Sequence, residues 1–207
     1  RDFAKTLENG KEQGTYNHYV SIDTQVLAMI LETVSDMPLR EYLSKKIWSR
    51  IGMESEAYYI TDKAGVDMAL GGLNATLRDY AKFGYLYLNN GQWFGEQIVP
   101  EDWVKASHTP DAPHLMPNAG ELSSNDWGYG YQWWPDRSGD WYYAVGSRKQ
   151  LIYVHPGLDI VAVRNGTLEL IGNTKHRRGD SYHLTQFPAY WDNVEFFQYI
   201  IDAAKIN

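Results

Sequence analysis

The sequence contains no cysteine in its 207 residues. This excludes disulfide frameworks, thiolate nucleophiles and cysteine-ligated zinc. The 6 histidines are scattered, and none stands in the H-x-x-x-H or H-E-x-x-H spacing of a metal site. The G-x-G-x-x-G, Walker and G-x-S-x-G patterns are also missing, which removes support for common nucleotide-binding and α/β-hydrolase interpretations. We therefore expect no bound metal and no cofactor.

Basic residues are outnumbered, with 19 Lys and Arg against 26 Asp and Glu and a net charge of −7. An acidic chain of this kind argues against nucleic acid as the main partner. No run of about 18 apolar residues occurs, so the sequence predicts no transmembrane segment. Hydrophobic residues make up 43% and charged residues 22%, which is the composition of a globular chain with a core.

The first half of the chain has the apolar spacing of helices. A helix face is predicted after residue 20, and Ser35 to Pro38 should end that helix. Further helices are expected at residues 39–50 and 77–89, and another after Pro100. A last amphipathic helix is expected at residues 191–205. The predicted face of the first helix consists of Ile22, Val26, Met29, Ile30, Thr33 and Val34.

The second half is dominated by β-branched and aromatic runs. We predict strands at residues 129–134, 141–146, 150–155 and 159–164, with an antiparallel hairpin at Pro156 and Gly157. Residues 107–126 indicate a long surface loop, and residues 175–185 a solvated loop, with an anion site as its alternative. Helices followed by a small antiparallel sheet and a covering helix predict an α+β fold that lacks edge strands.

Four stretches together resemble the serine β-lactamase and penicillin-binding-protein superfamily, in its class C-like branch of esterases and 6-aminohexanoate-dimer hydrolases. The first resembles the tyrosine motif of that family and contains Tyr19 and Ser21. The resemblance covers roughly residues 14–165 and implies a β-lactamase-like fold. The stretches are YVSIDTQVL at 19–27, GGLNATLRDYAKFG at 71–84, IVPEDWV at 98–104 and GYGYQWW at 128–134.

In that family the nucleophile is the serine of an S-x-x-K motif. No serine of this chain is followed by lysine three residues later. The resemblance therefore implies that residues 1–207 are the C-terminal part of a single β-lactamase-like domain with no internal boundary. It further implies that an upstream segment or companion chain supplies the serine and the lysine. Tyr19 would then be the catalytic base, because a nearby lysine stabilises its phenolate.

The other candidate residues concern substrate binding. Ser21 stands where many relatives carry asparagine, and it would hydrogen-bond Tyr19, the lysine or the substrate. The K-T-G-equivalent strand should lie near residues 141–149, in one of two registers. One register places Trp141 at the lysine position, and the other places the anion or amide contact at residues 147–149. The candidate substrate-binding residues on this strand are Gly146, Ser147, Arg148 and Lys149.

The resemblance predicts a serine hydrolase that cleaves a small ester or amide substrate through an acyl-serine. Its alternative is a non-catalytic relative that acts as a binding or scaffold module, because the S-x-x-K motif is not in this chain. Many relatives are exported, so the resemblance favours a periplasmic or secreted location. Four aromatic residues are candidates for lining an acyl or amide pocket, with core packing as the alternative for each: Trp133, Trp134, Tyr58 and Tyr59.

Overall fold

The computed structural model describes residues 6–8, 10–146, 150–166 and 193–205. The chain divides into two compact units, residues 1–166 and residues 167–207. In the described part of the second unit lies one helix, α6 (Asn193–Ala204), within the range predicted for the last helix. The loop predicted at residues 175–185 lies outside the described residues. That residues 1–207 form a single domain stays a prediction. No helix in the described ranges is long and apolar enough to cross a membrane.

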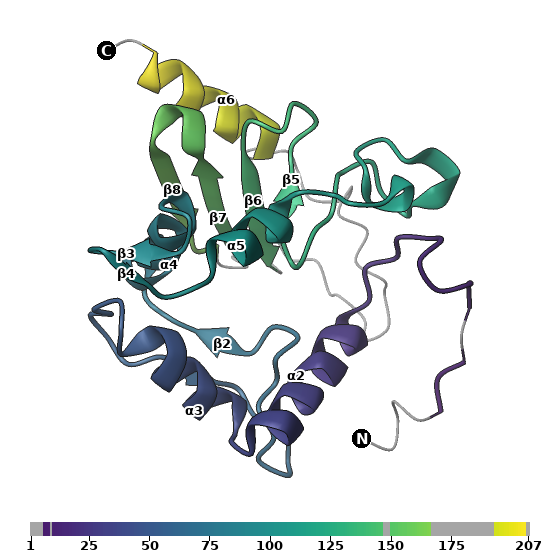
Figure 1. Cartoon of the computed structure of the whole chain (residues 1–207), viewed down its shortest axis with the longest axis vertical. Coiled ribbons are helices and arrows are strands. Elements are labelled where there is room, and N and C mark those ends of the chain that lie inside the picture. Colours follow the sequence, from purple (N-terminus) through teal and green to yellow (C-terminus); the bar gives the residue numbers. More distant parts are fainter. Residues whose placement is uncertain (1–5, 9, 147–149, 167–192, 206–207) are drawn as a thin grey trace, which may run out of the picture. The chain divides into compact units, whose positions relative to one another are not determined.

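A four-stranded antiparallel sheet is the centre of the first unit (Figure 1). Its strands follow the order β5-β6-β7-β8, and Tyr143 of β6 pairs with Tyr153 of β7. A tight turn with Asp159 in the left-handed conformation joins β7 to β8, which confirms the predicted hairpin. The strands are β5 (Trp134–Pro135), β6 (Tyr142–Gly146), β7 (Gln150–His155) and β8 (Ile160–Arg164). Two short hairpins pair β1 (Tyr58–Tyr59) with β2 (Leu73–Asn74) and β3 (Gln92–Trp93) with β4 (Glu96–Gln97).

The prediction of a strand at residues 129–134 is wrong. Only Trp134 of this stretch belongs to a strand, and the residues before it form a bent loop. Gly130 lies so close to the backbone carbonyl of Ser107 that a Cβ atom would collide with it. The amide of Tyr131 donates to the same carbonyl at 2.9 Å, and Gln132 has a positive φ of 69°. This contact with the preceding helix bends the chain, although its residue types favour a strand.

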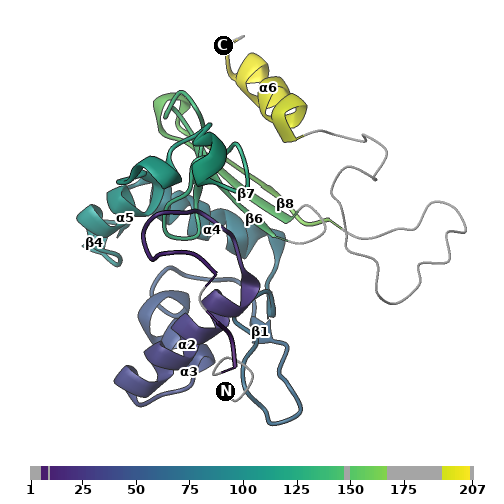
Figure 2. The same ribbon diagram turned by 90° about the vertical axis from the view of Figure 1, so that its right-hand side faces the viewer.

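Helices α4 (Leu77–Leu88) and α5 (Glu101–His108) form the core of the first unit together with the sheet, and Figure 2 shows α4 beside β6, β7 and β8. Both helices begin where the sequence predicts, because Thr76 caps α4 and Pro100 precedes α5. The ring of His108 stacks on Tyr142 at 3.9 Å between centroids. The buried residues of this core are Tyr87, Val104, Trp133, Tyr142 and Val154.

Two further helices form a hairpin at the other end of the first unit (Figure 1). Helix α2 (Ser21–Ser35) ends at Asp36, which is left-handed with φ 52°. Helix α3 (Leu39–Leu43) continues directly into a π-helical turn at Ser44–Trp48, so the predicted helix at 39–50 is confirmed with a local distortion. The hairpin is closed by the amide of Leu39, which donates to a carboxylate oxygen of Glu32 at 2.9 Å. The predicted face of α2 is wrong in part, because Ala28 is the buried residue of the helix and three members of that face are exposed, Ile30, Thr33 and Val34.

The packing of α4 against the sheet depends on Gly84. A Cβ atom at this position would lie 2.6 Å from a methyl group of Val161 and 2.9 Å from one of Ile152. We expect Gly84→Leu to lower the free energy of unfolding by about 2–3 kcal/mol, because the larger side chain forces α4 away from β7 and β8. Gly71, whose Cβ position is open, is the matched control. Urea unfolding followed by tryptophan fluorescence measures both variants, and equal stability of the two would contradict this account.

Candidate active site

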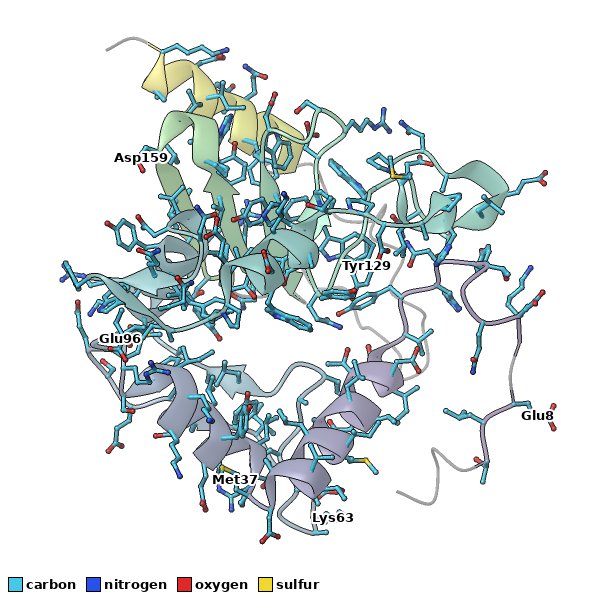
Figure 3. All side chains as sticks on the ribbon, viewed as in Figure 1. Glu8, Met37, Lys63, Glu96, Tyr129 and Asp159 are labelled. Atoms are coloured by element: carbon cyan, nitrogen blue, oxygen red, sulfur yellow. The ribbon has the colours of Figure 1, made fainter. Side chains whose placement is uncertain are left out.

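Tyr19 lies two residues before α2, with 42% of its surface exposed. Its ring contacts Tyr129 at 5.8 Å and Trp134 at 5.4 Å between centroids. Tyr129 and Trp134 also contact each other at 4.8 Å, so the three rings are mutual neighbours. We call them the Tyr19 cluster. Figure 3 labels Tyr129, which points toward the start of α2. The cluster thus brings together the segment before α2, which contains Tyr19, the loop before β5, which contains Tyr129, and the first residue of β5, Trp134.

The backbone before Tyr19 is held by a distant loop. The amide of Asn17 donates to the carbonyl of Leu122, and the amide of Ser124 donates to the carbonyl of Asn17, both at 2.9 Å. The side-chain amide of Asn17 reaches the hydroxyl of Ser123 at 3.2 Å. Asn17 is only 6% exposed. These bonds fix the approach of Tyr19 from the N-terminal side.

A second contact fixes the loop on the other side of the cluster. The side-chain amide of Gln132 donates to the hydroxyl of Thr24 in α2 at 3.3 Å. The next two residues point in different directions: Trp133 is 3% exposed and packs on Tyr87 in the core, whereas Trp134 packs on Tyr19. The bend before β5 thus places Tyr129 and Trp134 next to Tyr19.

Burial sets the acidity of the two tyrosines. It raises the pKa of Tyr19 above its ordinary value of 10. Burial is also the main cause that raises the pKa of Tyr129 to about 12, with smaller effects from the charges of Tyr19 and Asp23. Burial disfavours the phenolate because the charged form loses its hydration. Tyr19 can therefore act as a base near neutral pH only if a cation is brought next to its hydroxyl.

The structure describes some of the other predicted site residues. Ser21 is the first residue of α2, is exposed and lies two positions after Tyr19. Gly146 is the exposed last residue of β6, with the Gln150 side chain beside it. Gln150 exchanges two hydrogen bonds of 2.9 Å with the backbone of Gly166, which ties the segment after β8 to the start of β7. Ser147, Arg148 and Lys149 lie outside the described residues.

The sequence does not indicate Tyr129 as a member of the cluster, because it predicts one strand at residues 129–134 and the bend in this stretch brings Tyr129 to Tyr19. Of the two tryptophans predicted as candidates for lining a pocket, Trp134 lies against Tyr19, whereas Trp133 belongs to the core. A shallow hollow of about 340 Å³ near the C-terminal end of α2 is lined by other residues, among them Met37 and Arg40. Within the described ranges, no group of His, Asp and Glu could hold a metal ion.

Comparison with known proteins identifies the class. The Beta-lactamase family matches residues 1–168. The chain therefore belongs to the Beta-lactamase family, and its mixed helices and antiparallel sheet form part of a β-lactamase-like fold.

The most informative relatives are hydrolases. The chain is 30% identical over 166 residues to the 6-aminohexanoate-dimer hydrolase of Paenarthrobacter ureafaciens, which is 79% of this chain and 42% of that protein. A Bacillus anthracis structure assigned as a 6-aminohexanoate-dimer hydrolase superimposes with a TM-score of 0.70 and 35% identity, over 78% of this chain and 41% of the other. A structure assigned as a β-lactamase from Bacteroides dorei DSM 17855 shares the fold, with a TM-score of 0.58 and 17% identity over 78% of this chain and 54% of the other.

The chain thus spans less than half the length of the two 6-aminohexanoate-dimer hydrolases that it matches. More than half of each of those proteins has no counterpart in it.

Proposed function

We propose that this chain is the base-carrying part of a serine hydrolase that cleaves a small ester or amide through an acyl-serine. The observation that carries the proposal is the Tyr19 cluster: a half-exposed tyrosine held at the start of α2, in a member of the Beta-lactamase family. The relatives named as hydrolases support hydrolysis as the reaction class. The nucleophilic serine and its lysine come from residues outside this chain.

In this proposal the lysine next to Tyr19 offsets the effect of burial and stabilises the phenolate. The Tyr19 oxygen accepts the serine proton as the serine oxygen attacks the substrate carbonyl carbon. It then returns the proton to the leaving alcohol or amine as the bond to the acyl carbon breaks. In the second half, water attacks the acyl carbon and the Tyr19 oxygen takes the water proton. It returns this proton to the serine oxygen as the bond between that oxygen and the acyl carbon breaks, which releases the acid and restores the serine.

The remaining candidate residues have binding roles in the proposal. The hydroxyl of Ser21, two residues from Tyr19, hydrogen-bonds Tyr19, the lysine or the substrate. The backbone after β6, from Gly146 onward, presents N–H groups to the carbonyl oxygen, where they stabilise the oxyanion. Arg148 or Lys149 binds a substrate carboxylate. The roles of residues 147–149 rest on the family resemblance.

A serine-directed fluorophosphonate tests this division of labour. The polypeptide encoded immediately upstream of this chain is produced with it, and intact masses and hydrolysis of a p-nitrophenyl ester are measured. We expect an adduct on the upstream polypeptide and turnover only when both polypeptides are present. An adduct or turnover with this chain alone would overturn the proposal. If the complex shows no labelling and no turnover, that result favours the non-catalytic alternative, a binding or scaffold module.

A further inference from the structure

The dipeptide Asn-Gly occurs three times in the chain, at residues 9–10, 90–91 and 165–166. In this dipeptide the backbone nitrogen of the glycine can attack the side-chain amide of the asparagine, because glycine has no Cβ atom to hinder the approach. The attacking nitrogen has to give up its proton, so a hydrogen bond from the glycine N–H slows the reaction. Asn9 lies outside the described residues. For the other two dipeptides, the structure shows what holds the glycine N–H.

The N–H of Gly91 is held by the backbone. It donates to the carbonyl of Leu86 at 2.8 Å, in the turn that ends α4. Gly91 is buried, and its own carbonyl accepts from two amides of the segment that follows. A glutamine side chain, that of Gln97, contacts the same peptide bond only at its other end, where it donates to the carbonyl of Asn90 at 2.8 Å. The nitrogen of Gly91 therefore stays bonded whatever the side chain of Gln97 does.

The N–H of Gly166 is held by a side chain instead. Asn165 and Gly166 come directly after β8, and neither belongs to a strand. The amide of Gly166 donates to Oε1 of Gln150 at 2.9 Å, and Nε2 of Gln150 donates to the carbonyl of Gly166 at 2.9 Å. Both bonds are made by one side-chain amide, so both are lost together when that amide turns away.

We propose that Asn165 is a site of spontaneous deamidation that the side chain of Gln150 holds in check. When the Gln150 amide turns away, the nitrogen of Gly166 attacks Cγ of Asn165, and the new bond between them forms as the bond from Cγ to Nδ2 breaks. The Asn165 side-chain nitrogen leaves as ammonia and takes with it the proton of the Gly166 nitrogen. Water then opens the resulting succinimide at either of its carbonyl groups, which gives aspartate or isoaspartate at position 165.

The modification changes the contact that Gln150 makes. Either product adds a negative charge beside the end of β8, and isoaspartate also lengthens the backbone before Gly166 by one methylene group. The longer backbone moves Gly166 out of register with the Gln150 amide. Gln150 is the first residue of β7 and pairs with Gly146 at the end of β6. Deamidation therefore loosens the sheet at the strand end where the candidate substrate-binding residues begin, whatever reaction the chain takes part in.

The test compares the unchanged chain with Gln150→Ala and Gln97→Ala in mildly alkaline buffer. Peptide mapping by mass spectrometry follows asparagine, aspartate and isoaspartate at positions 90 and 165 over time. Gln97→Ala is the matched control, because it removes a glutamine amide from an Asn-Gly carbonyl and leaves the N–H of Gly91 on Leu86. We expect Gln150→Ala to raise the deamidation rate at position 165 about tenfold, because both bonds to Gly166 are lost. The rate at position 90 should be the same in all three chains.

A second measurement needs no variant. The unchanged chain should deamidate at position 165 about tenfold more slowly when folded than when unfolded in guanidinium chloride, and hydrogen exchange should show the Gly166 amide protected. Circular dichroism and urea midpoints establish that the variants are folded, and if Gln150→Ala does not fold, this comparison decides alone.

Equal rates at position 165 in the unchanged chain and in folded Gln150→Ala would overturn the proposal, as would equal rates in the folded and unfolded chain. So would a Gln97→Ala variant that accelerates position 165 as much as Gln150→Ala does, because the protection would then come from the fold in general and not from the Gln150 amide.

Discussion

Replacing Tyr19 by phenylalanine is expected to lower ester hydrolysis by about 10²- to 10⁴-fold when the chain is combined with the polypeptide that carries the serine and lysine. Phenylalanine keeps the ring contacts with Tyr129 and Trp134 and loses only the hydroxyl. The loss should appear in kcat, with KM little changed, because the removed group acts on a proton in the transition state. Steady-state kinetics with a p-nitrophenyl ester measures it.

A matched control is available on α4. Tyr85 is 45% exposed, close to the 42% of Tyr19, and it also packs edge-on against another aromatic ring, that of Trp93 at 5.7 Å. Tyr85→Phe should leave the rate unchanged. The active form of Tyr19 is the phenolate, so activity should rise as pH increases through its pKa, and this limb should vanish in Tyr19→Phe. A rate for Tyr19→Phe within twofold of the control would remove Tyr19 from the mechanism.

The second large effect concerns stability, at Asp79. This carboxylate is completely buried in the first turn of α4. One oxygen accepts from the amide of Glu54 at 2.7 Å, and the other accepts from the hydroxyl of Thr76 at 2.7 Å. Thr76 in turn accepts from the amide of Asp79 at 3.2 Å and caps the helix. One side chain thus joins the helix cap to the segment after α3.

We expect Asp79→Ala to lower the free energy of unfolding by about 3 kcal/mol, because the amide of Glu54 and the hydroxyl of Thr76 lose their carboxylate acceptor together, each in a partly buried hydrogen bond. Asp79→Asn should cost less, since its carbonyl oxygen still accepts from Glu54. Asp102, an exposed carboxylate in the first turn of α5, is the control for loss of charge near a helix start. Urea unfolding of the isolated chain gives all three values. A loss for Asp79→Ala no larger than that for Asp102→Ala would show that the hydrogen bonds contribute little.

The elements that the sequence predicts well are those with local signals. Thr76 at a helix start, Pro100 before α5, and Pro156 with Gly157 between two β-branched runs act on their immediate neighbours, and the structure places α4, α5 and the β7–β8 hairpin there. The strand prediction for residues 129–134 is wrong because a contact with the backbone carbonyl of Ser107 imposes a bend there, and residue types do not reveal that contact.

The candidate site was predicted only at its centre. The motif around Tyr19 singles out that residue, but its neighbour Tyr129 lies far along the chain. Tyr129 reaches Tyr19 because the loop that follows it is bent by its contact with Ser107. The periodicity of the sequence also does not predict which side of α2 faces inward. Apolar spacing marks a helix face, but hydrogen bonds by Gln25 and Glu32 decide which side turns inward.

Strand β8 ends the four-stranded order among the described residues, next to β7 alone. It reads Ile-Val-Ala-Val before Arg164, without proline and without charge over those four positions. Such segments are the ones most prone to intermolecular pairing when their outer edge is open. Where that edge is open, a higher concentration of the chain favours edge-to-edge pairing between molecules, and a charge such as that of the arginine at the end of the strand opposes it.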